Sequence, residues 1–121
     1  MSETRHKRVE SLLREELSRI IATGRIKDPR LQTMYSVTRV QASKDLKEAR
    51  VYISVLDSTE KASSRQSVID ALNHAAGYVQ RLIGGVVRLR HTPRLRFLLD
   101  DTIRRDVDFT HRLEDLAPGE S

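Results

Sequence analysis

The chain reads Ala71-Leu-Asn-His-Ala-Ala-Gly77-Tyr-Val79 at the point where two helix-like runs meet. A glycine inside a helix costs about 1 kcal/mol relative to alanine, so one straight helix through Gly77 is disfavoured. The helical apolar repeat nevertheless continues on both sides of this glycine, at Val68/Ile69, Leu72, Ala75/Ala76, Val79, Leu82/Ile83 and Val86. We therefore predict two helices that share one buried stripe, separated by a kink at Ala75-Ala76-Gly77, with the second helix ending near Val86.

Charge is distributed unevenly along the chain. Residues 1–30 hold eight Lys and Arg against five Asp and Glu, residues 31–60 hold four of each, and residues 61–96 hold seven against Asp70 alone. The net charge is therefore +9 over residues 1–96 and −4 over residues 97–121. This asymmetry indicates a polyanionic partner such as a nucleic acid, and the alternative is that the arginines are ordinary solvated surface.

The composition limits the kind of protein. A chain of 121 residues, 38% of them apolar, has the size of one domain. It contains no cysteine, which excludes a disulfide, a thiolate zinc site and a cysteine nucleophile. Residues 1–13 lack the apolar run of a signal peptide, and no segment approaches the ~20 apolar residues that span a bilayer. We expect a soluble, cytoplasmic protein.

The N-terminal region is predicted to be helical over residues 4–23. Gly24 stands where a C-terminal cap belongs, and Asp28-Pro29 then stops the helix because the residue before a proline is driven out of the helical region. The apolar residues of this segment fit one helical face: Val9, Leu12/Leu13, Leu17 and Ile20/Ile21.

Three segments have the composition and alternation of strands. Residues 34–43 and 49–56 are rich in β-branched and aromatic residues, and the charged residues 44–48 between them predict an antiparallel hairpin. After Pro93, residues 94–99 alternate apolar side chains with arginines and predict a third strand.

The predicted elements follow the order α-β-β-α-kink-α-β. This order indicates an α+β fold with helices on one face of a three-stranded sheet, and it is the order associated with type II KH domains. The strand order beyond the hairpin does not follow from the sequence. Asp57 and Glu60 resemble a capping pair before the helix pair, residues 102–112 are expected to form a short helix, and residues 117–121 are expected to be disordered.

Four blocks of residues add a resemblance to these patterns. They are Ile26-Lys-Asp-Pro-Arg-Leu31, Ser43-Lys-Asp-Leu-Lys-Glu-Ala-Arg-Val-Tyr-Ile53, Ala71-Leu-Asn-His-Ala-Ala-Gly-Tyr-Val79, and Leu89-Arg-His-Thr-Pro-Arg-Leu-Arg-Phe97 followed by Asp100-Asp101. In this order and spacing, from Arg5 to Ile103, the chain resembles bacterial ribosome-binding factor A.

The resemblance implies a KH-like RNA-binding domain over residues 1–112, in which Ala75-Ala76-Gly77 replaces the usual Gly-x-x-Gly loop, and a disordered acidic tail over residues 113–121. It implies a non-catalytic maturation factor that binds the free small (30S) ribosomal subunit near the 5′ end of 16S rRNA, late in assembly. Cold-adaptive growth is a common theme of the family. We expect a monomer with no cofactor, and other assembly factors or GTPases are further candidate partners.

The chain departs from the family beside the kink. Members commonly place an arginine three residues after the kink glycine, where this chain has Gln80 followed by Arg81. One residue turns a side chain by about 100° around a helix, so it is open whether Arg81 meets the same phosphate.

The candidate RNA contacts combine backbone amides, small residues and basic side chains. A kink exposes amides near Gly77-Tyr78-Val79, where the helix dipole favours an anion, and small residues leave room for a close approach. The planar fork of arginine suits phosphate. The candidates are Arg5, Lys7, Arg8, His74, Ala75, Gly77, Arg81, Arg88, Arg90 and Arg94.

Most of these features also have a purely structural explanation. The small residues can serve helix packing alone, and Arg94 and Arg96 can occupy the solvent face of the last strand. His74 can cap a helix or be solvated, and a frayed first turn would carry Arg5 and Arg8 at almost no cost. The five aromatic residues form no stacking ladder, which favours recognition of backbone and shape.

Two other functions are alternatives. A general DNA-binding or nucleoid-associated module would use the same basic face. A magnesium-dependent hydrolase would need Asp100, Asp101, Asp106 and Asp108, but adjacent acids on a strand point to opposite faces. The sequence has no P-loop or nucleophile-elbow pattern and no zinc-helix spacing of histidines, so we expect neither catalysis nor a metal.

Overall fold

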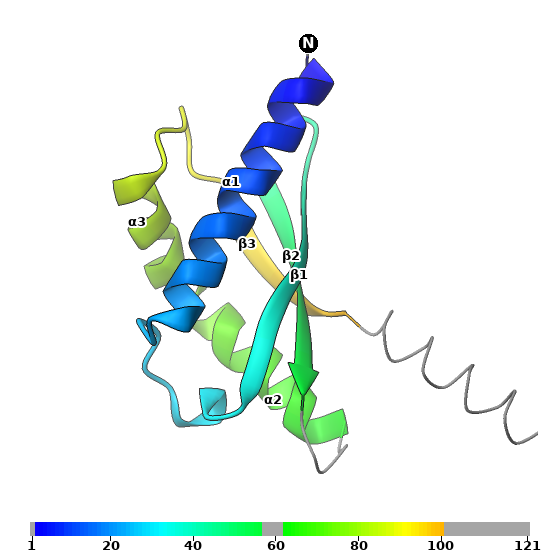
Figure 1. Cartoon of the computed structure of the whole chain (residues 1–121), viewed down its shortest axis with the longest axis vertical. Helices are drawn as coiled ribbons and strands as arrows, with labels where there is room; N and C mark the ends of the chain where they lie inside the picture. The colour runs from blue at the N-terminus through cyan, green and yellow to red at the C-terminus, as the bar shows by residue number, and fades with distance from the viewer. Residues whose placement is uncertain (1, 57–61, 101–121) are drawn as a thin grey trace, which may run out of the picture.

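The computed structural model describes residues 2–56 and 62–100. Its elements run in the order predicted from the sequence (Figure 1). They are α1 (Ser2–Ala22), the short 3-10 helix η1 (Pro29–Leu31), β1 (Met34–Ala42), β2 (Glu48–Leu56), α2 (Ala62–His74), α3 (Ala76–Val86) and β3 (Arg94–Leu99). The capping pair at Asp57 and Glu60, the helix over residues 102–112 and the tail over 113–121 lie outside the described residues.

Helix α1 ends as the sequence predicts. Gly24 adopts a φ of 65°, the left-handed conformation that glycine tolerates best. Its N–H donates to the carbonyl of Ile21 (3.1 Å), and the N–H of Arg25 donates to the carbonyl of Ile20 (3.2 Å). These two bonds form a Schellman cap, so the chain leaves α1 in a defined direction toward η1.

The three strands form one mixed sheet in the order β1-β2-β3. Strands β1 and β2 are the predicted antiparallel hairpin, with Val40 opposite Val51. A bulge between Val37 and Arg39 shifts the register of β1. Strand β3 pairs with β2 in parallel, and helices α2 and α3 form the crossover that this pairing requires.

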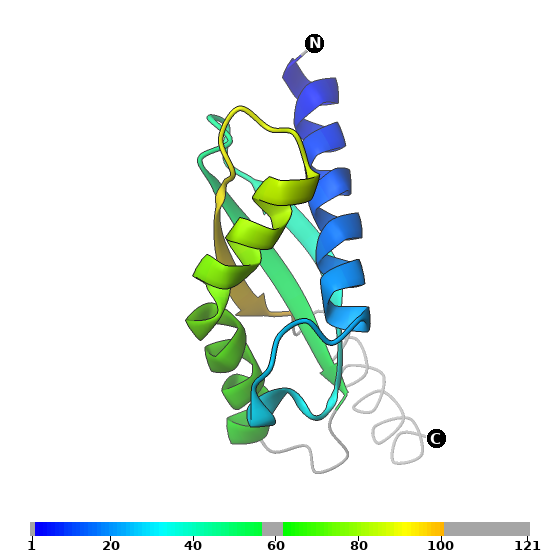
Figure 2. The same cartoon turned by 90° about the vertical axis from the view of Figure 1, so that its left-hand side faces the viewer.

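All three helices cover one face of the sheet and leave the other face open (Figures 1 and 2). The core lies between these layers, where Leu13, Leu72, Ile83 and Phe97 are almost completely buried. Two positions of the predicted apolar faces are wrong, because Leu12 is 38% and Val86 60% exposed, and Val87 is buried in place of Val86. Val87 follows the last residue of α3 and has an extended backbone, which turns its side chain toward the core. Val86, the last helical residue, faces solvent instead.

Side chains occupy part of both edges of the sheet. Asn73 of α2 donates to the carbonyl of Phe97 (2.9 Å) and accepts from its N–H (2.8 Å). Gln80 of α3 accepts from the N–H of Leu95 (3.0 Å). On the opposite edge, Glu10 of α1 accepts from the N–H of Ala42 (2.8 Å). These contacts tie each long helix to a strand edge and limit the edge groups available to another strand.

The arrangement confirms the predicted α+β class and is consistent with a KH-like fold. None of the helices in the described part of the chain is long and apolar enough to cross a membrane.

Candidate nucleic-acid interface

The predicted kink is a break at one residue. Ala75 has a φ of −90° and a ψ of 3°, outside the helical values, and its N–H still bonds back into α2. The first bond of α3 runs from the N–H of Val79 to the carbonyl of Ala75 (3.0 Å), and Ala75 offers no side-chain cap. The N–H groups of Ala76, Gly77 and Tyr78 therefore remain available to a ligand, at the positive end of the α3 dipole.

Gly77 has no structural need to be a glycine. Its φ is not in the left-handed region, and a Cβ built on it would meet no atom within 4 Å. Ala75 and Ala76, in contrast, are half-buried and pack against the core. The packing explanation therefore holds for the two alanines but not for Gly77, whose missing side chain leaves open space next to the free amides.

The other two glycines of α3 provide a comparison. A Cβ on Gly84 would lie 3.1 Å from the hydroxyl of Thr92, so this glycine permits close packing. Gly85 is open in the same way as Gly77, but it lies near the other end of the helix.

Gln80, which stands where the family commonly has an arginine, has a structural role in this chain. Gln80 is half-buried and turned toward the sheet, where its carbonyl oxygen holds the N–H of Leu95. Arg81 is exposed and lies four residues after Gly77, which places both on one face of α3. Arg81 is thus directed away from the strand edge that residue 80 occupies, and it flanks the open space beside Gly77.

His74 is exposed at the end of α2, close enough to η1 for its charge to act on Asp28. Hydrogen bonds from the side chain and the backbone of Arg30 hold the pKa of Asp28 below its usual value, and His74 adds a smaller effect in the same direction. His74 therefore lies at the kink by its position in the chain and is close enough to Asp28 for a weak electrostatic effect.

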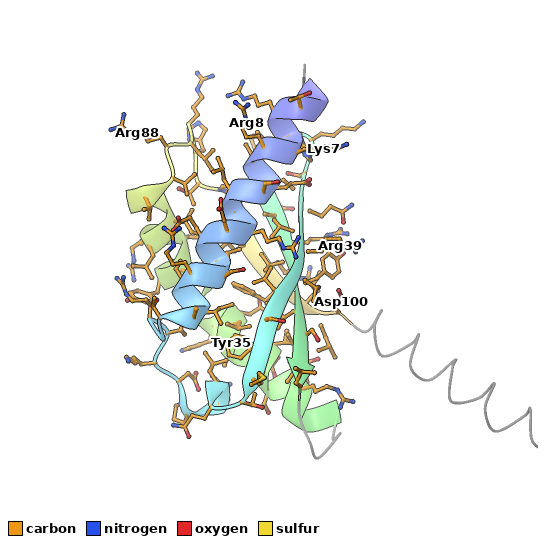
Figure 3. All side chains as sticks on the ribbon, viewed as in Figure 1. Lys7, Arg8, Tyr35, Arg39, Arg88 and Asp100 are labelled. Carbon is orange, nitrogen blue, oxygen red and sulfur yellow. The ribbon has the colours of Figure 1, made fainter. Side chains whose placement is uncertain are left out.

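Most of the basic candidates lie at one end of the molecule. Arg88 and Arg90 are exposed in the loop after α3, at the end where α1 begins with Arg5 and Arg8 (Figure 2). The kink lies about half-way along the molecule in the same view. Lys7 points to the other side of α1 from Arg88 (Figure 3), so the candidates form at least two groups.

The first turns of α1 are anchored to the sheet. The ring of His6 lies 2.9 Å from the carbonyl oxygen of Ser43 through Nε2 and 3.5 Å from the carboxylate of Glu10 through Nδ1. These contacts tie the start of α1 to the hairpin turn, which weighs against a frayed end as the explanation for Arg5 and Arg8.

Arg94 does not join either group. Arg94 and Arg96 are exposed on β3, while Leu95 and Phe97 between and after them are buried under the helices. Both arginines therefore project from the open face of the sheet. This agrees with the alternative that they occupy the solvent face of the last strand. Two further arginines of that face, Arg39 and Arg50, were not among the candidates. The alternation of polar and apolar residues around them could have indicated that they face solvent on the same side of the sheet.

The late aspartates do not form a metal site within the described structure. Asp100 accepts a short hydrogen bond from the hydroxyl of Thr38 across the sheet. Among residues 2–56 and 62–100 there is no group of three or more His, Cys, Asp or Glu that could hold a metal ion. Asp101, Asp106 and Asp108 lie outside these ranges.

Residues 5–113 match the family model described as Ribosome-binding factor A. The chain belongs to this family. The ribosome-binding factor A of Acetivibrio thermocellus is 38% identical over 113 residues, which cover 93% of this chain and 89% of the relative. That of Clostridium botulinum strain Hall is 36% identical over 121 residues, which cover 100% of this chain and 98% of the relative.

Solved structures of the family share the fold. The crystal structure of ribosome-binding factor A from Thermus thermophilus is similar with a TM-score of 0.66 and 28% identity, over 78% of this chain and 93% of that one. A homology model of the Thermus thermophilus factor, fitted into the cryo-electron microscopy map of a 30S complex, is similar with a TM-score of 0.53 and 28% identity. It covers 74% of this chain and 92% of the other.

Proposed function

We propose that this protein binds the free small (30S) ribosomal subunit and assists the late maturation of 16S rRNA without catalysing a reaction. Membership of the ribosome-binding factor A family supports the partner, and so does the neighbouring structure described in a 30S complex. The proposed place of action is near the 5′ end of 16S rRNA, in the cytoplasm.

The observation that carries the RNA contact is the open space beside Gly77. A glycine in the first turn of α3, with ordinary φ and no neighbour within 4 Å, gives up helix stability without a packing reason. It lies next to the three backbone N–H groups of the first turn of α3, which by their position lack an acceptor within the helix and receive no side-chain cap from Ala75. A phosphate oxygen of the RNA backbone fits this combination of small side chain, free donors and positive dipole.

The proposed binding mode uses backbone contacts first. Arg81 neutralises the phosphate held at the kink, while Arg88, Arg90, Arg5 and Arg8 hold neighbouring RNA at the end of the molecule. The protein then favours a maturing rRNA conformation because it binds that conformation more tightly than the alternatives. We propose that it does so as a monomer, and the occupied sheet edges at Asn73 and Glu10 support this.

The test is the distribution of the full chain in a sucrose gradient of cell lysate, together with a competition experiment. We expect the protein to migrate with free small subunits and their precursors and to be absent from translating ribosomes. In the competition, small-subunit rRNA fragments should displace it far better than duplex DNA at physiological salt. Equal affinity for duplex DNA, or no migration with small subunits, would favour the DNA-binding alternative and contradict the proposal.

A further inference from the structure

The face of the sheet opposite the helices is basic. Arg39 of β1, Arg50 of β2, and Arg94 and Arg96 of β3 are all exposed there, and they come from all three strands. No described helix covers this face in either view (Figures 1 and 2). We refer to these four arginines as the sheet arginines.

Two of the sheet arginines face each other, and none of the four has an ion-pair partner among the described residues. Arg50 and Arg96 are direct partners across the β2–β3 pair, and like charges in this position destabilise a sheet. No ion pair involving any of the four exists within residues 2–56 and 62–100. Glu48 is the Cα partner of Arg94, yet their charged groups do not come within ion-pair distance. An anion that lay across Arg50 and Arg96 would relieve this repulsion.

The basic surface continues from the sheet onto α1. A groove between α1 and β1 is lined by Lys7, Arg14 and Arg39, and Lys7 lies on the same side of the molecule as Arg39 (Figure 3). The acid in this groove, Glu10, is already engaged by the N–H of Ala42. Arg39 therefore joins the groove to the sheet arginines in one basic track.

Arg39 also indicates what the track binds. Its guanidinium carbon lies 4.2 Å from the centre of the Tyr52 ring, so the arginine covers one ring of the open face. A base that stacked on this ring would have to displace the arginine. The guanidinium held over the ring keeps its N–H donors on the open face of the sheet, where they suit a phosphate, so the track favours an RNA backbone over exposed bases.

We propose that the open sheet face is a second RNA-contact surface, which holds the phosphate backbone of an rRNA segment along Lys7, Arg39, Arg50 and Arg96. This inference deepens the proposed function and rests on it. The kink and the sheet arginines lie on opposite layers of the fold, so the protein would be inserted between two segments of rRNA rather than docked through one face.

The test compares two double variants of the full chain with equal loss of charge. The variant R50Q/R96Q removes the two opposed sheet arginines, and the control R25Q/K27Q removes two exposed basic residues between α1 and η1. Affinity for purified small subunits is measured over a series of salt concentrations. We expect R50Q/R96Q to lower the salt slope by about 1.4 to 1.8, since each phosphate contact contributes about 0.7 to 0.9, and R25Q/K27Q to leave it within measurement error.

A thermal melt accompanies the binding data. Because R50Q/R96Q removes a like-charge pair, its Tm should equal or exceed that of the wild type, so weaker binding would not reflect unfolding. An unchanged slope for R50Q/R96Q, in a preparation whose wild-type chain binds small subunits, would overturn the second surface and leave the proposed function intact. Tighter binding by R50Q/R96Q would also overturn it, because the face would then hold an acidic protein segment that competes with RNA.

Failure of the wild-type chain to bind small subunits would instead overturn the proposed function together with this inference.

Discussion

Gly77 and Gly85 lie in the same helix, and both face open space, but only Gly77 adjoins the free amides. Replacing either residue by alanine should raise the free energy of unfolding by up to about 1 kcal/mol, because alanine is the better helix former. Gly77→Ala should at the same time weaken binding to small subunits severalfold, because its methyl group enters the space proposed for the phosphate. Denaturant titration and a binding assay on the same samples measure the two effects.

Gly85→Ala is the matched control for this substitution. It should stabilise the fold and leave the affinity for small subunits unchanged. If Gly77→Ala binds as well as the control, the amides at the kink do not hold RNA.

Arg65 is a second residue with an unusual environment. It is 7% exposed, and its buried Nε and Nη1 atoms have no hydrogen-bond partner among residues 2–56 and 62–100. Buried donors without partners cost about 1–3 kcal/mol each, so Arg65→Met should raise the free energy of unfolding by about 1 kcal/mol or more. Arg81→Met, at an exposed position, should change it by less than about 0.5 kcal/mol. A loss of stability in Arg65→Met would mean that water or an anion satisfies these atoms in solution.

For single residues, the sequence predicted backbone conformation better than it predicted which groups a side chain contacts. The kink at Ala75 and the cap at Gly24 follow from local preferences, and both were predicted. The role of Gln80 was not predictable, because its partner Leu95 lies 15 residues along the chain. Val86 was placed on the buried stripe although it is exposed, because the chain becomes extended directly after this last helical residue and Val87 takes the inward position.

Among the elements, β3 depends on side chains from both crossover helices. Asn73 takes both backbone groups of Phe97 and so acts as a substitute for a neighbouring strand. Asn73→Ala should lower the free energy of unfolding by about 1–3 kcal/mol, because two strand groups lose their partner. Gln66→Ala removes an exposed hydrogen bond to Asp70 on the same helix and should cost no more than about 0.5 kcal/mol.

The substitution Asn73→Ala also exposes the edge of β3, where a strand of a second chain could pair. Analytical ultracentrifugation of Asn73→Ala should therefore detect a larger share of dimers or higher species than in the wild type. A variant that is both as stable and as monomeric as the wild type would show that Asn73 does not protect this edge.

The strands themselves were predicted to within one residue at each end, since alternation and β-branched residues are local signals. The parallel pairing of β3 with β2 was not predictable in the same way. It depends on how the α2–α3 pair packs across the sheet, and that packing is a property of the assembled core.

Over the whole molecule, the basic end should control the salt dependence of binding. Arg88→Ala and Arg90→Ala should each reduce the salt slope of small-subunit binding by roughly one unit, because each removes one phosphate contact. Arg25→Ala, at an exposed position between α1 and η1, should leave the slope unchanged. The measurement is the logarithm of the binding constant against the logarithm of salt concentration. Slopes equal to the wild type for both Arg88 and Arg90 variants would remove the loop after α3 from the interface.

The net charge of residues 1–96 follows from the sequence. How that charge is distributed between the helical side and the open sheet face of the fold does not. Arg81 and Arg88 lie on the helical side, whereas Arg94 projects from the sheet, because a strand and a helix direct their side chains by different periods. The basic track through Arg39 and Arg50 needed the strand register before its residues could be seen as neighbours.

The parallel pairing of β3 also sets an order of events during synthesis. Residues 94–99 leave the ribosome after both crossover helices, and Asn73 and Gln80 have no strand to hold until then. The hairpin of β1 and β2 consists of local contacts and can form early, while the third strand closes the longest loop and forms late. A nascent chain therefore acquires the contacts that fix the direction of both crossover helices only after residues 94–99 have been made, so the proposed RNA contact at the elbow between these helices would come late in the folding of the domain.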